Sequence, residues 1–449
     1  MKHICKFVVA MAFAVSTPAW AEDATVAKFF PNCTPLPSAP GHTVTVGPAG
    51  NADAFAATLK GAQPGDTIAL KSGDYGVLDL RGSQHNGFVT IAAAPGQTPH
   101  FTRINIASAS HLRLTGLTVS RPVGVYQNLM VLIQNSDNVI FDHNIMQSHD
   151  GDFDWVATKP GTPSSPSSGV GARQSSCISI TDNKIHNVMN GIDVGGDQSN
   201  DHGQYYLLNN NVIDNFSGDG IDHYGSHGRI ENNRIIDGHD LCNNCVHQDG
   251  IQGWNYNHLP IHNSDVVISG NMIISQATPG LVLPSSGLQG ITIFDGDWDD
   301  VHVFNNVVLV NAWHGITLNW VRSGSIINNT LGSTNPAHGN WIKATRTKDI
   351  PDDAPYNMIV RNNAVPGPMR RDSPGLVAYW SAGNYGLKDA NEYADDFVKF
   401  DREKPAYDMH LAKGSPLIGA GMADGAPPTD IDGHPRKGSI DIGAYAYQR

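Results

Sequence analysis

The sequence predicts an all-β protein whose short strands wind into one continuous parallel coil. A two-part motif, Gly-Ile followed by Asn-x-Ile/Val, recurs along the chain. For example, D-G-I-D at 219–222 is repeated as D-G-I-Q at 249–252. The tightest repeats on the Asn step, from 211 to 233 and from 306 to 329, are 22 and 23 residues long by subtraction. A period in the low twenties with alternating β-branched residues is typical of stacked coils. The 47 Gly and the low share of charged residues, 16%, favour many short strands and turns over helices.

The first 21 residues are predicted to be a secretory signal peptide. Lys2 and Lys6 precede an apolar run at 7–15, and A-W-A at 19–21 matches a small-residue cleavage site. The run is too short to span a bilayer, and no later segment approaches the roughly 18 apolar residues that a transmembrane helix needs. We therefore expect a secreted or periplasmic protein that is soluble and monomeric and has no membrane partner.

Residues 22–87 are expected to form an N-terminal segment and a cap. The stretch 22–45 is Pro-rich and irregular, and D-A-F-A-A-T-L-K-G at 53–61 predicts a short amphipathic helix that starts at Asp and ends at Gly. A strand is expected at 67–70. A helix at this point would cover the open end of the coil, whose first turn otherwise exposes strand edges and core.

Residues 88–365 are expected to form the coil itself. Each turn contributes two or three short strands with inward aliphatic side chains, and equivalent residues of successive turns stack about 4.8 Å apart. One asparagine per turn lies at a bend, where stacked amides can bond one another and satisfy the backbone groups that the bend frees. This predicts a purely structural asparagine ladder of Asn144, Asn183, Asn211, Asn233, Asn271, Asn306, Asn329 and Asn363.

Insertions between the repeats are expected to form loops on one flank of the coil, and residues 366–449 are expected to close its far end. In solenoids such loops build the walls of one binding face. The longest insertions occupy 147–176, 237–247, 255–264, 275–287 and 333–356.

Cys33, Cys177, Cys242 and Cys245 remain after removal of the signal peptide, an even number in an oxidising compartment. The short spacing of Cys242 and Cys245 favours a disulfide between them that closes a small loop. The competing interpretation is a metal site with His239 and His247. The sequence assigns no partner to Cys33 or to Cys177.

The net charge is −13, and most of it lies in the centre of the chain. Between Cys177 and Thr330 there are 4 Lys+Arg and 16 Asp+Glu, a balance of −12, together with ten of the 20 His. This acidic centre argues against nucleic acid as a partner, because phosphates require the opposite charge. A polyanionic substrate would need a bound cation or a protonated histidine at the site.

Two polar columns flank the repeated Gly-Ile step and form the predicted active site. Stacking would place Asp219 over Asp249, and Asp193 over Asp222, about 5 Å apart. Two carboxylates this close cannot both remain charged cheaply, so one takes up a proton or a cation binds between them. An aspartate at a D-G-I turn can also be purely structural, capping backbone amides. The column before Gly is Asn190, Asp219, Asp249, Gln289 and His314, and the column after Ile is Asp193, Asp222, Gln252, Thr292 and Thr317.

Three sets of candidate site residues follow from these columns and from the residues near them. Aromatic side chains fit sugar-stacking platforms, with core packing as the alternative, and cations can hold substrate carboxylates. The dense acidic turn F-D-G-D-W-D-D at 294–300 fits a Ca²⁺ site, with a solvated loop as the alternative. The catalytic candidates are Asp222, His223, Tyr224, His247 and Asp249. The substrate-binding candidates are Asp193, Gln252, Trp254, His314, Trp320, Lys343 and Arg346. The metal-ligand candidates are Asp219, Asp295 and Asp297.

The chain resembles the exported right-handed parallel β-helix proteins of the pectate-lyase-like superfamily. The resemblance covers nearly the whole mature chain and rests on the repeat, the N-terminal helix, early turns such as G-L-T-V-S at 116–120, and the ending D-I-D-G-H-P-R-K-G-S-I-D-I-G-A-Y-A-Y at 430–447. It implies one right-handed β-helix that acts on polysaccharides as a lyase, a glycoside hydrolase or a uronate C5-epimerase, or that binds them. The polygalacturonase-like set is not found in order, and G-S-H-G-R at 225–229 only echoes it.

The leading hypothesis is a lyase that cleaves a uronate-containing polysaccharide by β-elimination. Ca²⁺ held by some of Asp222, Asp249 and Asp295 would neutralise the uronate carboxylate. Either His247 or His223 would remove the C5 proton, and Tyr224 would protonate the leaving oxygen. A C5-epimerase would use the same parts. A glycoside hydrolase would use Asp219, Asp222 and Asp249 as acid and as nucleophile or base, and a non-catalytic glycan-binding protein is the third class.

Overall fold

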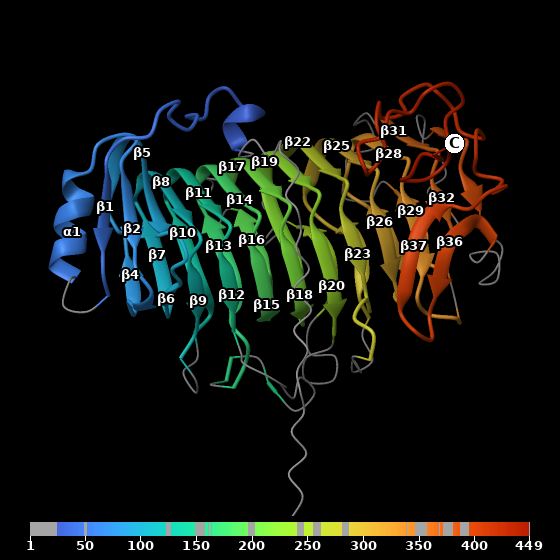
Figure 1. The fold of residues 1–449 in the computed structure, drawn as a ribbon. Coiled ribbons are helices and arrows are strands. Elements are labelled where there is room, and N and C mark those ends of the chain that lie inside the picture. The colour runs from blue at the N-terminus through green and yellow to red at the C-terminus, as the bar shows by residue number, and fades with distance from the viewer. Residues whose placement is uncertain are drawn as a thin grey trace, which may run out of the picture.

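The computed structural model describes residues 25–48, 52–122, 127–148, 158–159, 161–162, 164–195, 203–239, 247–254, 262–280, 287–337, 339–345, 357–367, 369–370, 380–386 and 395–448. Within them the chain forms a right-handed parallel β-helix with a short α-helix near its N-terminus, which confirms the predicted fold class (Figure 1). No helix in the described ranges is long and apolar enough to cross a membrane.

Each full turn of the coil adds one strand to each of three parallel sheets, so that strands far apart in sequence lie side by side. Sheet 1 contains β1 (Thr43–Val46), β2 (Thr67–Leu70), β5 (Gln84–Ala93), β8 (Ser110–Thr115), β11 (Asp137–Asp142), β14 (Ser176–Thr181), β17 (Gly203–Asn209), the second part of β19 (Ile221–Glu231), β22 (His262–Ser269), β25 (Asp297–Phe304), β28 (Ser323–Ile327), β31 (Asn357–Arg361) and β34 (Trp380–Ala382). Sheet 2 contains β3 (Gly73–Asp74), β6 (Pro99–Phe101), β9 (Thr118–Ser120), β12 (Ile145–Gln147), β15 (Lys184–Val188), β18 (Val212–Phe216), β20 (Arg234–Gly238), β23 (Met272–Ile274), β26 (Val307–Val310), β29 (Thr330–Ser333), β32 (Ala364–Val365) and β35 (Tyr385–Gly386). Sheet 3 contains β4 (Val77–Asp79), β7 (Arg103–Ala107), β10 (Leu129–Gln134), β13 (Ser168–Arg173), β16 (Ile192–Gly195), the first part of β19, β21 (Asp249–Gly253), β24 (Gln289–Ile293), β27 (His314–Leu318), β30 (Trp341–Ala344) and β33 (Met369–Arg370).

The two ends of the coil are covered differently. The helix α1 (Ala52–Gly61) lies beside β1 at the N-terminal end, where the sequence places it (Figure 1). At the other end β36 (Phe397–Asp401) and β37 (Ala406–Leu411) form an antiparallel pair. Phe397 and Leu411 pack with Leu309 of β26, so this last segment covers the outside of sheet 2. Parallel pairing runs from β1 to β35 and therefore extends beyond residues 88–365 in both directions.

The asparagine ladder forms as predicted and explains how the backbone polar groups at the bend of each turn are hydrogen-bonded. The side-chain oxygen of Asn211 accepts hydrogen bonds from the backbone N–H and the amide Nδ2 of Asn183, at 3.1 and 3.0 Å. Its own Nδ2 donates to the carbonyl of Ile180 at 2.8 Å and to Asn233 at 3.0 Å. All eight predicted members are fully buried. Their amides therefore hydrogen-bond buried backbone groups that water cannot reach.

The residue that precedes each ladder asparagine takes the left-handed backbone conformation. Asp182, Asn210 and Asn305 have φ of 58°, 55° and 53°, and Gly270 has φ of 65°. Only Gly, Asn and Asp adopt this region readily, since other side chains clash with the backbone there. This requirement explains why the repeat reads N-N, D-N or G-N at seven of the eight ladder positions; His143, with φ of 55°, precedes Asn144.

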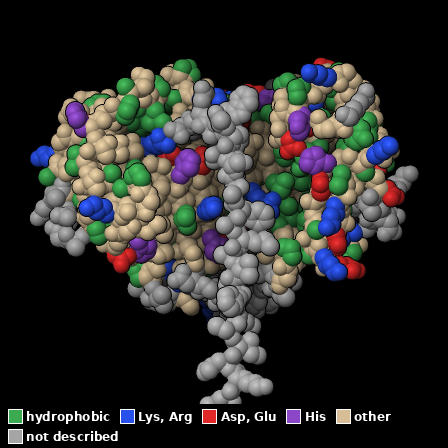
Figure 2. Space-filling model, in the orientation of Figure 1, with side chains coloured by type: hydrophobic (Ala, Val, Ile, Leu, Met, Phe, Trp, Pro, Cys, Tyr) green, Lys and Arg blue, Asp and Glu red, His purple; other side chains and the backbone are tan. Residues whose placement is uncertain are grey.

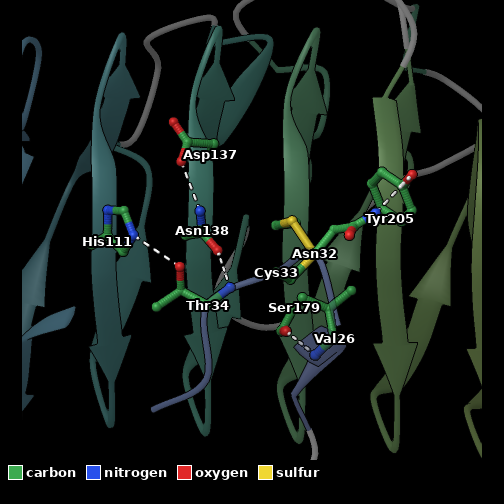
Figure 3. The surroundings of a disulfide bond; sticks show 10 residues. Val26, Asn32, Cys33, Thr34, His111, Asp137, Asn138, Ser179 and Tyr205 are labelled. Atoms are coloured by element: carbon green, nitrogen blue, oxygen red, sulfur yellow. Dashed lines mark hydrogen bonds between the residues drawn. A yellow bond between two sulfur atoms is a disulfide. The ribbon is translucent and has the colours of Figure 1, made fainter. Parts of the chain in front are cut away.

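A disulfide fastens the N-terminal segment to the outside of sheet 1. Cys33 and Cys177, which the sequence left unassigned, are joined across 144 residues of sequence (Figure 3). Beside it the N–H of Val26 donates to Ser179, and the N–H of Thr34 donates to Asn138. The favoured pair at 242 and 245 lies outside the described residues.

Candidate functional site

The predicted polar column lies on the outer face of sheet 3 and stacks in register. Asp193 pairs with Asp222, Asp222 with Gln252, Gln252 with Thr292, and Thr292 with Thr317. The neighbouring positions in each strand, such as Ile221, Ile251 and Ile291, are buried in the core. Because side chains alternate between the two faces of a strand, the polar column points away from the core. The stacking inferred from the repeat is confirmed.

Three aspartates of this face form one tightly packed cluster, Asp219, Asp222 and Asp249. The backbone N–H of Asp249 donates to Asp219 Oδ1 at 2.8 Å, and the charges of Asp222 and Asp249 both act on Asp219. Asp249 accepts hydrogen bonds from Thr292 Oγ1 at 2.8 Å and from Gln252 Nε2 at 3.1 Å. Asp249 is fully buried and Asp222 is 7% exposed, whereas Asp219 is partly exposed. Of the three residues, Asp219 is the most exposed.

Burial makes these three carboxyl groups hard to ionise. It raises the pKa of Asp249 to about 7, against the hydrogen bonds from Thr292 and Gln252, which lower it. The pKa of Asp219 is raised by burial first and then by the charges of Asp222 and Asp249. The pKa of Asp222 is raised by burial first and then by the charges of Asp193 and Asp249. The cluster therefore keeps protons at a pH where ordinary carboxyl groups are fully ionised, as general acids must.

Two residues beside the cluster complete its polar surroundings. Asn190 Nδ2 donates to Asp222 Oδ2 at 2.9 Å, and Arg173 Nη2 forms an ion pair with Asp193 Oδ2 at 2.8 Å. The other oxygen of Asp222, Oδ1, receives no hydrogen bond from an amide or hydroxyl of the described residues. Asn190 stands in the column before Gly, so the sequence pattern found its position but not its role. No sequence signal pointed to Arg173.

His223 is not available to act as the base, which corrects the prediction for this residue. It is fully buried inside the coil, where its Nδ1 lies 3.0 Å from the hydroxyl of Tyr206 and its ring meets Trp298 edge-on at 5.3 Å. Burial lowers the pKa of His223 to about 3, so the ring is neutral at physiological pH. It follows Asp222 directly in a strand and therefore points to the opposite face.

Tyr224 and His247 have very different environments. Tyr224 is 4% exposed and packs in the core beside Trp298, and burial and the charge of Asp295 raise the pKa of its hydroxyl to about 12. It belongs to the core rather than to the aspartate cluster, so its assignment as the acid is corrected. His247 is exposed and lies two residues before Asp249, with its Nδ1 3.2 Å from Gln289 Nε2. Of the two predicted bases, His247 is the one that solvent can reach.

The predicted sugar-binding aromatic residues divide between core and surface. Trp254 is partly exposed next to His223, and Trp320 is partly buried against the core. Trp298, which lies within the acidic turn at 294–300, is fully buried and belongs to the core. His314 lies on the outer face of sheet 3, with its Nδ1 2.8 Å from Thr317 Oγ1. Lys343 continues the polar column on the next strand, paired with Thr317, whereas Arg346 lies outside the described residues.

The carboxylates of the acidic turn at 294–300, the predicted Ca²⁺ site, are paired with protein groups of the described residues. Asp297 forms an ion pair with Arg322 at 2.6 Å, and Asp295 contributes its backbone carbonyl to the indole N–H of Trp298. Asp299 is bonded to Ser323 instead. Asp297 and Asp299 are two residues apart in β25 and point to the same face, where both approach His262, at 3.5 and 3.8 Å.

One group with metal-ligand chemistry occurs elsewhere among the described residues. Asp430, Asp432 and His434 bring one ligand atom each within 4.8 Å of the others, in the segment that covers the C-terminal end of the coil. Both oxygens of Asp430 already accept backbone hydrogen bonds, from the N–H groups of Asp432, His434 and Ala446. In Figure 2, acidic, histidine and basic side chains gather on the side of the molecule where Figure 1 places β36 and β37. This group is remote in the fold from sheet 3.

Comparison with known proteins supports the fold and leaves the reaction open. No protein-family model matches the chain, and none of the curated proteins matches it. Among solved structures it is similar to the pectate lyase Pel9A, with a TM-score of 0.53 and 14% identity over 95% of this chain and 100% of that one. It is also similar to an alginate lyase from Paenibacillus sp. str. FPU-7 (TM-score 0.42, 13% identity, 77% of this chain and 99% of that one). The Azotobacter vinelandii mannuronan C-5 epimerase AlgE6 A-module gives a TM-score of 0.44 and 13% identity over 74% of this chain and 92% of that one. The match to Pel9A confirms the resemblance to pectate-lyase-like β-helices at the level of fold.

Proposed function

We propose that this chain is a polysaccharide-active enzyme that cleaves a uronate-containing polysaccharide by β-elimination. The observation that carries the proposal is the aspartate cluster on the outer face of sheet 3, whose carboxyl groups have raised pKa values and whose member Asp249 follows the exposed His247 by two residues. An acid and a base within reach of one substrate are what the elimination requires. The fold likeness to a pectate lyase agrees with this chemistry.

The reaction breaks the C5–H bond of a uronate and the bond from C4 to the bridging oxygen, and it forms a double bond between C4 and C5. We assign the base to His247 and the acid to Asp219. To act as the base, His247 must carry its proton on Nδ1 and leave Nε2 free to take the C5 proton. The amide of Gln289 lies 3.2 Å from Nδ1, and when it is rotated so that its oxygen faces the ring, Nδ1–H donates to that oxygen and fixes this tautomer. Asp219 then protonates the bridging oxygen, so one proton is taken up and one is released.

The carboxylate of the substrate must also be neutralised before the C5 proton can leave. Among the described residues, the three carboxyl groups of the cluster do not bring one oxygen each within 4.8 Å of the others, as Asp430, Asp432 and His434 do, so we do not assign Ca²⁺ to the cluster. All three carboxyl groups have raised pKa values, so the cluster can hold more than one proton. A protonated member, Asp222 in this assignment, donates a hydrogen bond to the uronate carboxylate.

The test is a panel of uronate polysaccharides and neutral polysaccharides, read by the ultraviolet absorbance of unsaturated products and by new reducing ends. We expect both signals from a uronate polymer, and a loss of about a hundredfold or more in kcat for Asp219→Asn and for His247→Gln. Asp137→Asn, which changes an exposed carboxylate on sheet 1, is the matched control and should leave kcat unchanged. No unsaturated product from any uronate polymer would overturn the proposal. Loss of turnover with a chelator would transfer the neutralising role from Asp222 to a cation.

A glycoside hydrolase is the second candidate, supported by the aspartate cluster itself. Hydrolysis needs two carboxyl groups, one protonated and one ionised, and the cluster offers both. New reducing ends without the ultraviolet signal would select the hydrolase. A C5-epimerase would give neither signal but would change the uronate composition of the polymer.

A further inference from the structure

The polar column of sheet 3 changes sign along the axis of the coil. Its N-terminal members, Asp193 and Asp222, are acidic, and its C-terminal member Lys343 is basic. The members between them are Gln252, Thr292 and Thr317, which are uncharged. The outer face of one sheet therefore runs from an acidic end to a basic end.

The spacing between the two ends is set by the strands. Asp222 and Lys343 are separated by four strand-to-strand steps, through β21, β24, β27 and β30. At ~4.8 Å for each step the two residues lie ~19 Å apart along the coil axis. A sugar unit of an extended glycan spans roughly one such step. The column is thus long enough for about four sugar units laid along the axis.

Aromatic rings lie beside the basic end and have fixed positions. Trp313 is 47% exposed, and its ring stacks on Trp341 with centroids 5.5 Å apart and planes 30° apart. The ring of His314 meets Trp341 edge-on at 4.9 Å. The hydroxyl of Thr317 contacts both His314 Nδ1, at 2.8 Å, and the indole N–H of Trp341, at 3.3 Å. An exposed indole held in place by its neighbours offers a flat apolar surface that loses little conformational freedom on binding.

Trp341 and Lys343 belong to the same face of β30. They are two residues apart in a strand, and Ile342 between them is fully buried in the core. Alternation therefore puts the indole and the ammonium group on the outer face together. An aromatic platform beside a cation suits a sugar ring that carries a carboxylate, because the ring stacks on the indole and the carboxylate pairs with the ammonium.

We propose that Trp313, Trp341 and Lys343 form a second binding site for an acidic sugar, about four units along the same glycan from the bond that is cleaved at the aspartate cluster. The inference rests on the proposed function, because one glycan occupies both places. It makes the enzyme endo-acting and dependent on chain length. The acidic end of the column repels uronate carboxylates unless they are neutralised, so the distant cation supplies attraction that the reaction centre lacks.

The experiment compares Lys343→Gln and Trp313→Ala with Lys184→Gln, which removes an exposed lysine from sheet 2. Oligogalacturonides and alginate oligosaccharides, shorter and longer than about four sugar units, are the probes. We expect Lys343→Gln to raise KM about fivefold for the long oligosaccharides, with kcat unchanged, and to have no effect on the short ones. The effect should shrink at high salt, since the contact is a partly exposed charge pair. Trp313→Ala should show the same length dependence but no salt dependence. Lys184→Gln should match the parent protein.

The outcomes separate this inference from the proposed function. Turnover with the same KM in Lys343→Gln and parent at every length would overturn the second site and leave the lyase intact. Binding without turnover, measured by calorimetry with the same oligosaccharides and weakened by Lys343→Gln, would keep the second site and overturn the lyase. Circular dichroism and thermal midpoints equal to those of the parent show that each variant is folded, and loss of fold in Trp313→Ala leaves Lys343→Gln as the deciding variant.

Discussion

Replacing Asp249 with asparagine should stabilise the protein at alkaline pH. Its carboxyl group is fully buried, and burial raises its pKa from 3.8 to about 7. Ionising this group therefore costs about 4 kcal/mol more in the folded protein than in the unfolded chain. Because the folded pKa lies above the unfolded one, the stability that its proton contributes is complete below about pH 4 and is lost as the pH rises through about 7. Asparagine cannot ionise, so the variant escapes this loss.

The side chain of asparagine fits the contacts that Asp249 makes when protonated. Its Nδ2 can donate to Thr292 Oγ1, which then accepts instead of donating, and its Oδ1 can accept from Gln252 Nε2. We therefore expect a free energy of unfolding close to that of the parent near pH 4, and up to ~4 kcal/mol higher near pH 8. That figure is an upper value because Asp219 and Asp222 titrate together with Asp249 and share its protons.

The assay is urea denaturation of the parent and of Asp249→Asn across the range from about pH 4 to about pH 9. Asp137→Asn is the matched control, since it changes one exposed carboxylate whose contact is the hydrogen bond from Asn138. The midpoints of Asp249→Asn and parent should separate as the pH rises, whereas those of Asp137→Asn should stay with the parent. Parallel curves for Asp249→Asn and parent would refute the argument, because they would mean that Asp249 ionises in the fold as readily as in the unfolded chain.

Three further predictions concern the cluster, the ladder and the disulfide. In Asp249→Asn the alkaline limb of the pH–activity profile should move to lower pH, because the charge of Asp249 no longer raises the pKa of Asp219. A profile that superimposes on that of the parent would contradict this prediction. Asn211→Leu should lower the free energy of unfolding by about 3 kcal/mol or more, since it leaves the buried N–H of Asn183 unpaired, and thermal unfolding beside the exposed control Asn32→Ala should show it. The double variant Cys33→Ser/Cys177→Ser should lose up to ~5 kcal/mol of unfolding free energy, because the disulfide closes a loop with a sequence separation of 144 and so restricts the unfolded chain. A thermal midpoint equal to that of the parent would show that the N-terminal segment does not contribute to global stability.

The fold could be predicted from the sequence because its repeat encodes both requirements of the coil. The asparagine of each turn marks a buried hydrogen-bonding position, and the residue before it marks a left-handed backbone position. Together they fix the length of each turn and hence the register of the strands. The pairing of Asp222 with Gln252, read from the repeated phrase, followed from the same rule. The disulfide could not be predicted, because Cys33 lies before the repeats and no periodicity places it against Cys177.

The site was predicted less completely because burial is not visible in a list of polar residues. His223 and Tyr224 follow Asp222 in sequence, and their composition alone suggested an exposed catalytic group. The structure places both in the core with Trp298, since the chain runs from sheet 3 into sheet 1 within β19. The alternation of β19 could have excluded His223, because it follows an outward residue directly. The ion pairs of the acidic turn at 294–300 depend on His262 and Arg322, one turn earlier and one turn later along the coil, which no local pattern reveals.

The raised pKa values of the cluster follow from the geometry of the coil itself. Successive turns are separated by ~4.8 Å, so a D-G-I phrase that repeats in adjacent turns must bring its carboxyl groups into contact. In water two such charges repel weakly, but on a face where Asp249 is fully buried the repulsion and the loss of hydration are both large. Three aspartates in this arrangement lower the stability of the coil near neutral pH, whereas the glutamine and threonines at the following turns of the same column do not. Ionisation of Asp249 lowers the stability of the fold as the pH rises, but its charge also helps to raise the pKa of Asp219, the assigned acid, so the stability and the activity of Asp249→Asn at alkaline pH should change in opposite directions.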